Sequence, residues 1–90
     1  MYKATTTIVN PTGLHARPAA DFVSLAKSFV SDIQIKDLAT EEPAANAKSI
    51  LRVLTLGLSK GKNVEISAAG EDEEKAVTEL VSLIKSGFGE

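Results

Sequence analysis

The sequence predicts a small mixed fold of strands and helices in which the helices cover one face of a sheet. Two kinds of segment follow each other along the chain. In one, polar and apolar residues alternate, and in the other, apolar residues recur every three or four positions. Right-handed crossovers place successive helices on the same side of a sheet. The chain has 90 residues, 43% of them apolar, which is the size of one small domain. We therefore expect a single domain over residues 1–90.

The first two elements are a strand and a helix. Residues 2–9 are rich in β-branched side chains, and the loop-forming residues 10–13 (NPTG) follow them. Pro18 suits the first turn of a helix, where a missing N–H costs nothing. The apolar face of this helix is predicted to comprise Ala19, Phe22, Val23, Ala26, Phe29 and Val30.

The middle of the chain predicts a strand, an irregular segment and a short helix. Residues 32–36 alternate polar and apolar side chains, as a half-buried strand does. Residues 37–47 are poor in strand formers and contain Pro43, so any strand there is expected to be short, irregular or at an edge. Ser49 is the predicted N-cap of a short helix that ends near Gly57.

The last third predicts a strand and a helix. Residues 64–68 alternate again after a turn at residues 59–62. Asp72 is the predicted N-cap of the final helix, which ends near Lys85 and Gly87. Its apolar face is predicted to comprise Ala76, Val77, Leu80, Val81 and Ile84. Residues 86–90 are expected to fray.

Composition excludes several classes of function. Ten basic and twelve acidic residues give a net charge of −2, and only four residues are aromatic, which argues against a nucleic-acid-binding protein. There is no cysteine for a disulfide or a thiolate site, and one histidine cannot form a multi-histidine metal site. No signal peptide or membrane-spanning segment is evident, which predicts a cytoplasmic protein without membrane insertion.

The only histidine lies at the predicted start of the first helix, within residues 13–20 (GLHARPAA). The first amides of a helix, here those of Ala16 and Arg17, have no intrahelical acceptor and favour an anion. The guanidinium of Arg17 is suited to phosphate oxygens. Together these groups predict a receptor for a phosphoryl group, with His15 as the nucleophile. A surface histidine that caps a helix beside an ordinary arginine is the alternative interpretation.

Residues 13–20 resemble the active-site motif of the HPr family, the histidine-containing phosphocarrier proteins of the bacterial phosphoenolpyruvate-dependent sugar phosphotransferase system. Residues 47–61 (AKSILRVLTLGLSKG) and 66–77 (ISAAGEDEEKAV) are similar to two further family motifs. The resemblance implies an α+β open-faced β-sandwich, with a four-stranded antiparallel sheet and three helices on one face. It departs from the family at residues 37–48, which form a longer segment than usual, and at Arg52.

The resemblance also implies roles and partners. His15 would accept a phosphoryl group on Nδ1 from phosphorylated enzyme I and pass it to sugar-specific IIA domains, so the chain would be a carrier without enzymatic turnover or cofactor. Arg17 and the amides of Ala16 and Arg17 would hold the phosphate. Ser49 would be a regulatory site for an HPr kinase/phosphorylase. Leu14, Ile50, Leu51 and Leu54 would form the apolar docking surface of a monomer.

Two other classes of function remain open from the sequence. One is a small phosphate-handling enzyme of similar size, such as an acylphosphatase, which would release inorganic phosphate. The other is an HPr-like regulatory module that binds a partner without phosphoryl transfer. A phosphohistidine at His15 would distinguish the carrier from both.

Overall fold

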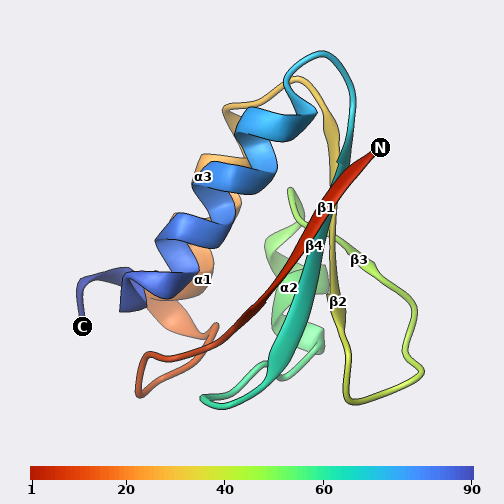
Figure 1. The fold of residues 1–90 in the computed structure, drawn as a ribbon. Coiled ribbons are helices and arrows are strands. Elements are labelled where there is room, and N and C mark those ends of the chain that lie inside the picture. Colours follow the sequence, from red (N-terminus) through yellow and green to blue (C-terminus); the bar gives the residue numbers. More distant parts are fainter.

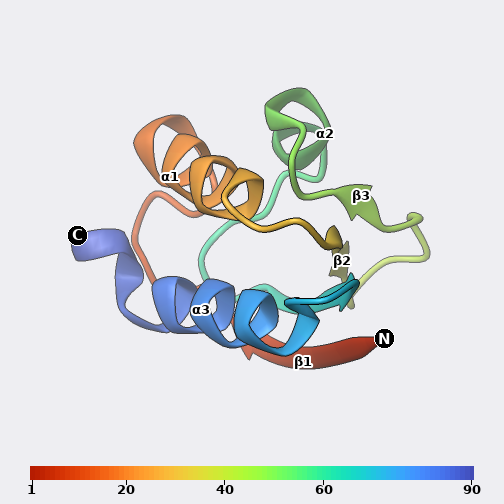
Figure 2. The ribbon, with the colours of Figure 1, turned by 90° about the horizontal axis from the view of Figure 1, so that it is seen from above.

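The computed structural model describes residues 1–90 and contains one antiparallel sheet with three α-helices on the same face (Figures 1 and 2). The strands β1 (Tyr2–Thr7), β2 (Asp32–Asp37), β3 (Ala45–Asn46) and β4 (Asn63–Ala69) lie in the order β1-β4-β2-β3. The helices are α1 (Ala16–Lys27), α2 (Ile50–Thr55) and α3 (Glu73–Lys85), followed by the 3-10 helix η1 (Gly87–Gly89). The open-faced sandwich implied by the resemblance is confirmed.

Strand β4 lies between β1 and β2, and its side chains show why an alternation of polar and apolar residues predicts a strand. Ile66 lies opposite Ala4 of β1 and Ile35 of β2. Ile66 and Ile35 are fully buried beneath the helices, whereas the neighbouring Glu65 is only half-buried on the opposite face. Because successive side chains of a strand point to opposite faces, one face of the sheet joins the core and the other stays polar.

Strand β3 is a two-residue edge strand. Asn46 pairs with Gln34 and Ala45 with Ile35. Pro43 precedes the strand by two residues and has no N–H to add to the ladder. The expectation that any strand within residues 37–47 is short, irregular or at an edge is confirmed, because β3 is both short and at an edge. Residues 38–43 form an exposed loop between β2 and β3 (Figure 1).

The prediction for the end of α1 is wrong at one residue. The helix ends at Lys27 with Ser28 as its C-cap, and Phe29 remains buried beyond it. Val30, which was expected on the buried face, is 73% exposed. The chain leaves the helical path after Ser28 to enter β2, so the helical period no longer applies to Val30.

Asp72 precedes α3 as predicted, but its side chain does not cap that helix. Its carboxylate accepts hydrogen bonds from the amide of Val30 at 3.0 Å, and from the amide and hydroxyl of Ser31. Ser31 is buried. Asp72 therefore ties the turn between α1 and β2 to the start of α3, two segments that are 41 residues apart in the chain.

The chain after α3 is folded, in contrast to the expected fraying. Gly87 and Phe88 have φ values of +72° and +56°, which turn the chain back toward the loop that follows β1. The Glu90 carboxylate accepts hydrogen bonds from Asn10 Nδ2 at 3.1 Å and from Thr12 Oγ1 at 2.9 Å. These donors from the loop after β1, far away in sequence, hold the C-terminal residues in place.

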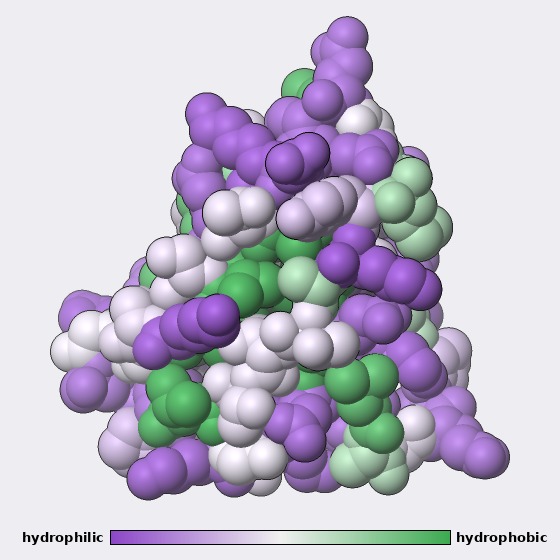
Figure 3. Space-filling view, in the orientation of Figure 1, coloured by the Kyte–Doolittle hydropathy of each residue, from purple (hydrophilic) through white to green (hydrophobic).

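Helix α3 covers β1 and β4, with four of its apolar residues fully buried: Ala76, Val77, Leu80 and Ile84. Val81 is only half-buried at the rim. Figure 3 shows apolar surface in a shallow hollow between α3 and β1. None of the helices combines the length and the apolar character needed to cross a membrane.

Candidate functional site

His15 occupies the N-cap position of α1 with an extended backbone and an exposed side chain. The imidazole makes no capping hydrogen bond to the helix. The side chain is exposed and forms no ion pair, as is required of a residue that reacts with another macromolecule.

The loop before His15 is anchored by buried groups. The amide of Leu14 donates to the carbonyl oxygen of Leu58 at 2.8 Å, and both leucines are fully buried. The buried Asn10 donates through Nδ2 to the carbonyl oxygen of Gly13 at 2.9 Å, and the Gly13 amide donates to Asn10 O at 3.1 Å. The backbone at His15 is thus held by the interior while its side chain remains in water.

Gly13 is required where this loop crosses the chain at Leu58. Its φ is +67°, a value that side-chain-bearing residues rarely adopt. A Cβ atom at this position would lie 2.4 Å from the Leu58 carbonyl oxygen and 2.8 Å from Ser59 Cα. The close approach that places Leu14 in hydrogen-bond range of Leu58 is therefore available only to glycine.

The two residues after His15 present donors without acceptors. As the first residues of α1, Ala16 and Arg17 have amides with no intrahelical acceptor, and these amides donate to no atom outside the helix. Ala16 has a φ of +50°, which costs about 1–2 kcal/mol for a residue with a Cβ atom. The Arg17 side chain is exposed and forms no ion pair. The predicted set of donors around His15 is available for an anion.

The four leucine and isoleucine residues predicted to form a docking surface are not equivalent. Leu14 is fully buried in the core, so its prediction as a docking residue is wrong, because its side chain is not accessible to a partner. Ile50 and Leu51 on α2 are 38% and 73% exposed, and Leu54 is half-buried. Because α2 packs against α1, the exposed pair lies on the helical layer that also carries His15.

Ser49 lies at the N-cap of α2, as the sequence predicted. Its hydroxyl oxygen accepts a hydrogen bond from the amide of Arg52 at 3.4 Å. The side chain is half-buried. A cap of this kind stabilises a helix by about 1 kcal/mol, which accounts for a serine here on structural grounds alone.

Sequence reasoning missed the contribution of Glu90. Its hydrogen bonds from Asn10, and after them those from Thr12, hold the pKa of the Glu90 carboxyl below its usual value. The carboxylate therefore stays ionised and bound to the loop that precedes His15. No local pattern relates residues 78 or 80 positions apart, so no signal in the sequence indicated this contact.

Comparison with known proteins identifies a family and relatives that match nearly the whole chain. Residues 2–86 match the family model described as the PTS HPr component phosphorylation site. The chain is 45% identical over 84 residues to the phosphocarrier protein HPr of Haemophilus influenzae, covering 93% of this chain and 95% of that protein. It is also 40% identical over 86 residues to the multiphosphoryl transfer protein of the same organism, covering 96% of this chain and 17% of the longer protein.

Solved structures give the same result. A structure of HPr from Thermoanaerobacter tengcongensis is 49% identical with a TM-score of 0.93, covering 100% of this chain and 98% of the other. A second structure, described as an HPr dimer from that organism, has the same identity, full coverage of both chains and a TM-score of 0.77. The family match over most of the chain and the shared fold lead to one conclusion: this chain belongs to the HPr family, the phosphocarriers of the phosphotransferase system.

Proposed function

We propose that His15 is the residue through which this phosphocarrier works, accepting a phosphoryl group on Nδ1 from phosphorylated enzyme I and passing it to a histidine of a sugar-specific IIA domain. The observation that carries this assignment is the exposed imidazole placed directly before the unpaired amides of α1. In each transfer the bond from phosphorus to the donor nitrogen breaks as the bond to the acceptor nitrogen forms. The chain has no turnover of its own.

Arg17 and the amides of Ala16 and Arg17 are proposed to hold the phosphate oxygens. Backbone donors at a helix N-terminus and a guanidinium both favour an anion. All three donors lie on the solvent side of the molecule, so they neutralise part of the charge without enclosing the group. This open arrangement suits a phosphoryl group that has to be received and released again.

The test is intact mass spectrometry after incubation with phosphoenolpyruvate and enzyme I, on the natural chain and on His15→Ala, with part of each sample treated with acid. We expect one phosphate adduct that acid removes and that His15→Ala lacks. No adduct on the natural chain, under conditions that load a known carrier, would contradict the proposal. Binding to enzyme I without an adduct would then favour a regulatory module without phosphoryl transfer.

We further propose that Ile50, Leu51 and Leu54 of α2 form an apolar docking surface for enzyme I and the IIA domains. Their support is the exposure of Ile50 and Leu51 on the helical layer that carries His15. Exposed apolar residues that gather on one face often mark a site of protein contact. An interface built on only three apolar residues favours brief complexes, as a carrier with several partners needs.

Ser49 is proposed as a regulatory phosphorylation site for an HPr kinase/phosphorylase. A phosphate at a helix N-terminus is favoured electrostatically, so it would add charge beside the docking surface without unfolding α2. Incubation with such a kinase and ATP is expected to give an acid-stable adduct on His15→Ala and none on Ser49→Ala. An adduct of equal yield on Ser49→Ala would refute this assignment.

The chain is also proposed to act in the cytoplasm as a monomeric single domain. Exposure of one face to successive partners supports a monomer, whereas the T. tengcongensis structure described as a dimer shows that a relative also forms dimers. Light scattering after size-exclusion chromatography measures the mass directly. A dimer mass that persists on dilution would contradict the monomer.

A further inference from the structure

A polar pocket of about 330 Å³ lies between α2, the loop from β2 to β3 and the residue before β4. Its volume is at the lower end of the range of small-molecule sites. Its charged and hydroxyl-bearing lining residues are Asp37, Thr40, Glu42, Arg52, Thr55 and Lys62. No residue of α1 or of the loop before His15 lines it. The pocket is therefore separate from the phosphoryl-transfer site.

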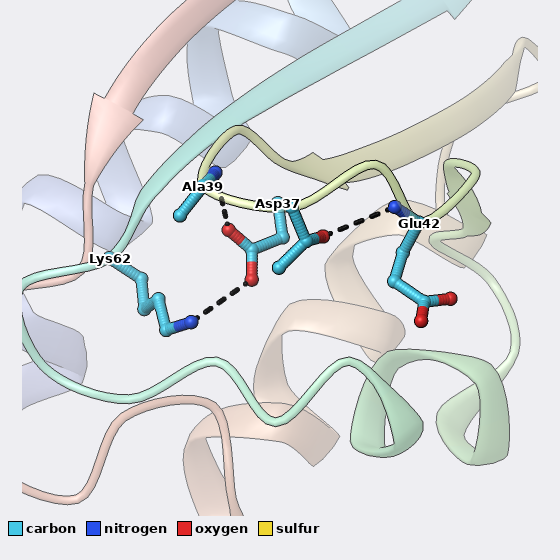
Figure 4. A network of polar contacts seen from close by, with 5 residues as sticks. Asp37, Ala39, Glu42 and Lys62 are labelled. Carbon is cyan, nitrogen blue, oxygen red and sulfur yellow. Dashed lines mark hydrogen bonds and ion pairs between the residues drawn. The ribbon is translucent and has the colours of Figure 1, made fainter.

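Asp37 supplies a fixed internal charge at the wall of this pocket. Its side chain is only 2% exposed. One carboxylate oxygen accepts from the amide of Ala39 at 2.9 Å and the other from Lys62 Nζ at 3.2 Å (Figure 4). The Ala39 hydrogen bond, and to a smaller extent Lys62, lowers the pKa of Asp37. Asp37 therefore stays ionised and orients the ammonium group of Lys62.

The cations of the pocket keep most of their donors unused. Lys62 has three N–H donors and gives one to Asp37, with its side chain 33% exposed. Arg52 has five side-chain donors, and its only hydrogen bonds are made by its backbone amide and carbonyl groups. Arg52 also forms no ion pair. The guanidinium is therefore free to bind an oxyanion.

One carboxylate lines the pocket together with these donors. Glu42 is exposed and forms no ion pair, and its backbone amide donates to Thr40 Oγ1 at 3.2 Å. The charges of Asp37 and Lys62 offset each other. Of the four charged residues that line the pocket, Arg52 and Glu42 are therefore the two that form no ion pair. A bare anion would satisfy Arg52 and be repelled by Glu42. A ligand that carries hydroxyl groups beside its anionic group would satisfy both.

We propose that this pocket binds a small hydroxylated organic anion, either a phosphate monoester or a carboxylate. Its anionic group pairs with the guanidinium of Arg52, in the two-point geometry that this group favours, and with the free donors of Lys62. A hydroxyl of the ligand donates to Glu42. The ligand bridges α2 and the loop from β2 to β3, which no hydrogen bond between side chains links at present.

The test is a titration of the isotope-labelled chain, followed by the nuclear magnetic resonance shifts of its amides at constant ionic strength. The probes are 3-phosphoglycerate, glycerol 3-phosphate and glycerate, with neutral glycerol as the control. We expect saturable shifts in residues 37–45 and 50–56 with the anions and none with glycerol. Glycerol 3-phosphate and glycerate report separately on the phosphate and the carboxylate. Shifts that do not saturate, or that gather only at residues 15–17, would overturn the proposal.

Arg52→Gln and Lys27→Gln form the matched pair of variants. Each removes one positive charge from an exposed helical side chain, and Arg52→Gln keeps the backbone amide that binds Ser49. Arg52→Gln is expected to weaken probe binding about tenfold, equal to ~1.4 kcal/mol, while Lys27→Gln leaves it unchanged. Equal weakening by both variants would show a general effect of charge and overturn the site. Phosphoryl transfer to His15 by enzyme I, measured on the same samples, reports on the other site independently.

Discussion

Substitution of Gly13 by alanine tests whether the crossing of the loop over Leu58 positions His15. The new Cβ atom would lie 2.4 Å from the Leu58 carbonyl oxygen, so the loop has to move and the 2.8 Å bond from Leu14 to Leu58 lengthens or breaks. The left-handed backbone costs about 1–2 kcal/mol, and forced overpacking adds about 1–3 kcal/mol. We expect Gly13→Ala to lower the free energy of unfolding by about 2–5 kcal/mol.

Gly57→Ala is the matched control for this prediction. Gly57 has a φ of +61°, close to the +67° of Gly13, but a Cβ atom there meets nothing within 4 Å. It therefore carries the backbone cost without the overlap, and we expect a loss of only about 1–2 kcal/mol. The difference between the two variants isolates the effect of the close approach.

Urea unfolding followed by circular dichroism measures both variants, with an unchanged slope as the sign of an unchanged two-state transition. A domain of this size has a total stability on the order of 5–13 kcal/mol, which exceeds the expected loss over most of that range, so we expect Gly13→Ala to fold without denaturant. In the absence of denaturant, enzyme I should phosphorylate Gly13→Ala more slowly than the natural chain, while Gly57→Ala keeps the natural rate. Equal losses of stability in the two variants, or a natural transfer rate in Gly13→Ala, would refute the positioning role of the crossing.

Two further predictions concern the carboxylate that joins two loops and the docking surface. Hydrogen bonds from the Ser31 hydroxyl, then from the Val30 and Ser31 amides, lower the pKa of Asp72. The stabilisation is therefore complete above about pH 5 and is lost as the pH falls through the lowered pKa. Asp72→Asn should be less stable at neutral pH and lose less on acidification, measured by urea unfolding from pH 7 to 3; an unchanged pH slope would contradict this. Leu51→Ala should weaken the binding of enzyme I about tenfold, measured by calorimetry, and change the free energy of unfolding by less than about 0.5 kcal/mol. Val30→Ala, whose side chain has the same 73% exposure, should leave binding unchanged. Equal effects of the two variants on binding would show that α2 is not part of the interface.

Periodicity predicted the order and type of the regular elements because burial has a period in each. Strand β4 alternates buried side chains with exposed or half-buried ones, and α3 buries four of the five residues expected from its helical stripe, with Val81 half-buried. Pro43 and the composition around it predicted that any strand there would be short, irregular or at an edge, and β3 is both short and at an edge. Local patterns therefore carried most of the fold.

Contacts between distant segments could not be predicted from such patterns. Asp72 looks like an N-cap in sequence, but Val30 and Ser31 offer it three donors from a turn that only the folded chain brings near. Glu90 likewise finds its donors on Asn10 and Thr12. In both cases the carboxylate accepts hydrogen bonds from residues that lie near it in the folded structure but far from it in the sequence.

The candidate site shows the same division. His15, Ala16 and Arg17 could be chosen from sequence because the chemistry of a helix start is local. Leu14 could not be assigned correctly, because an apolar residue beside a site has the same appearance whether it faces a partner or the core. Leu14 is buried in a core cluster whose other members, such as Leu58, lie far along the chain.

The burial of Leu14 also explains how an exposed histidine can be well positioned. An imidazole that has to meet several partners cannot be enclosed by its own protein, so its position has to come from the backbone. Here Leu14 and Asn10 anchor the backbone before His15, and the buried Pro18 and Ala19 anchor the chain after Ala16, so the strained backbone at Ala16 persists. Substitutions at the anchors should therefore slow phosphoryl transfer by displacing His15, whereas substitutions of Arg17 should act on the phosphate itself.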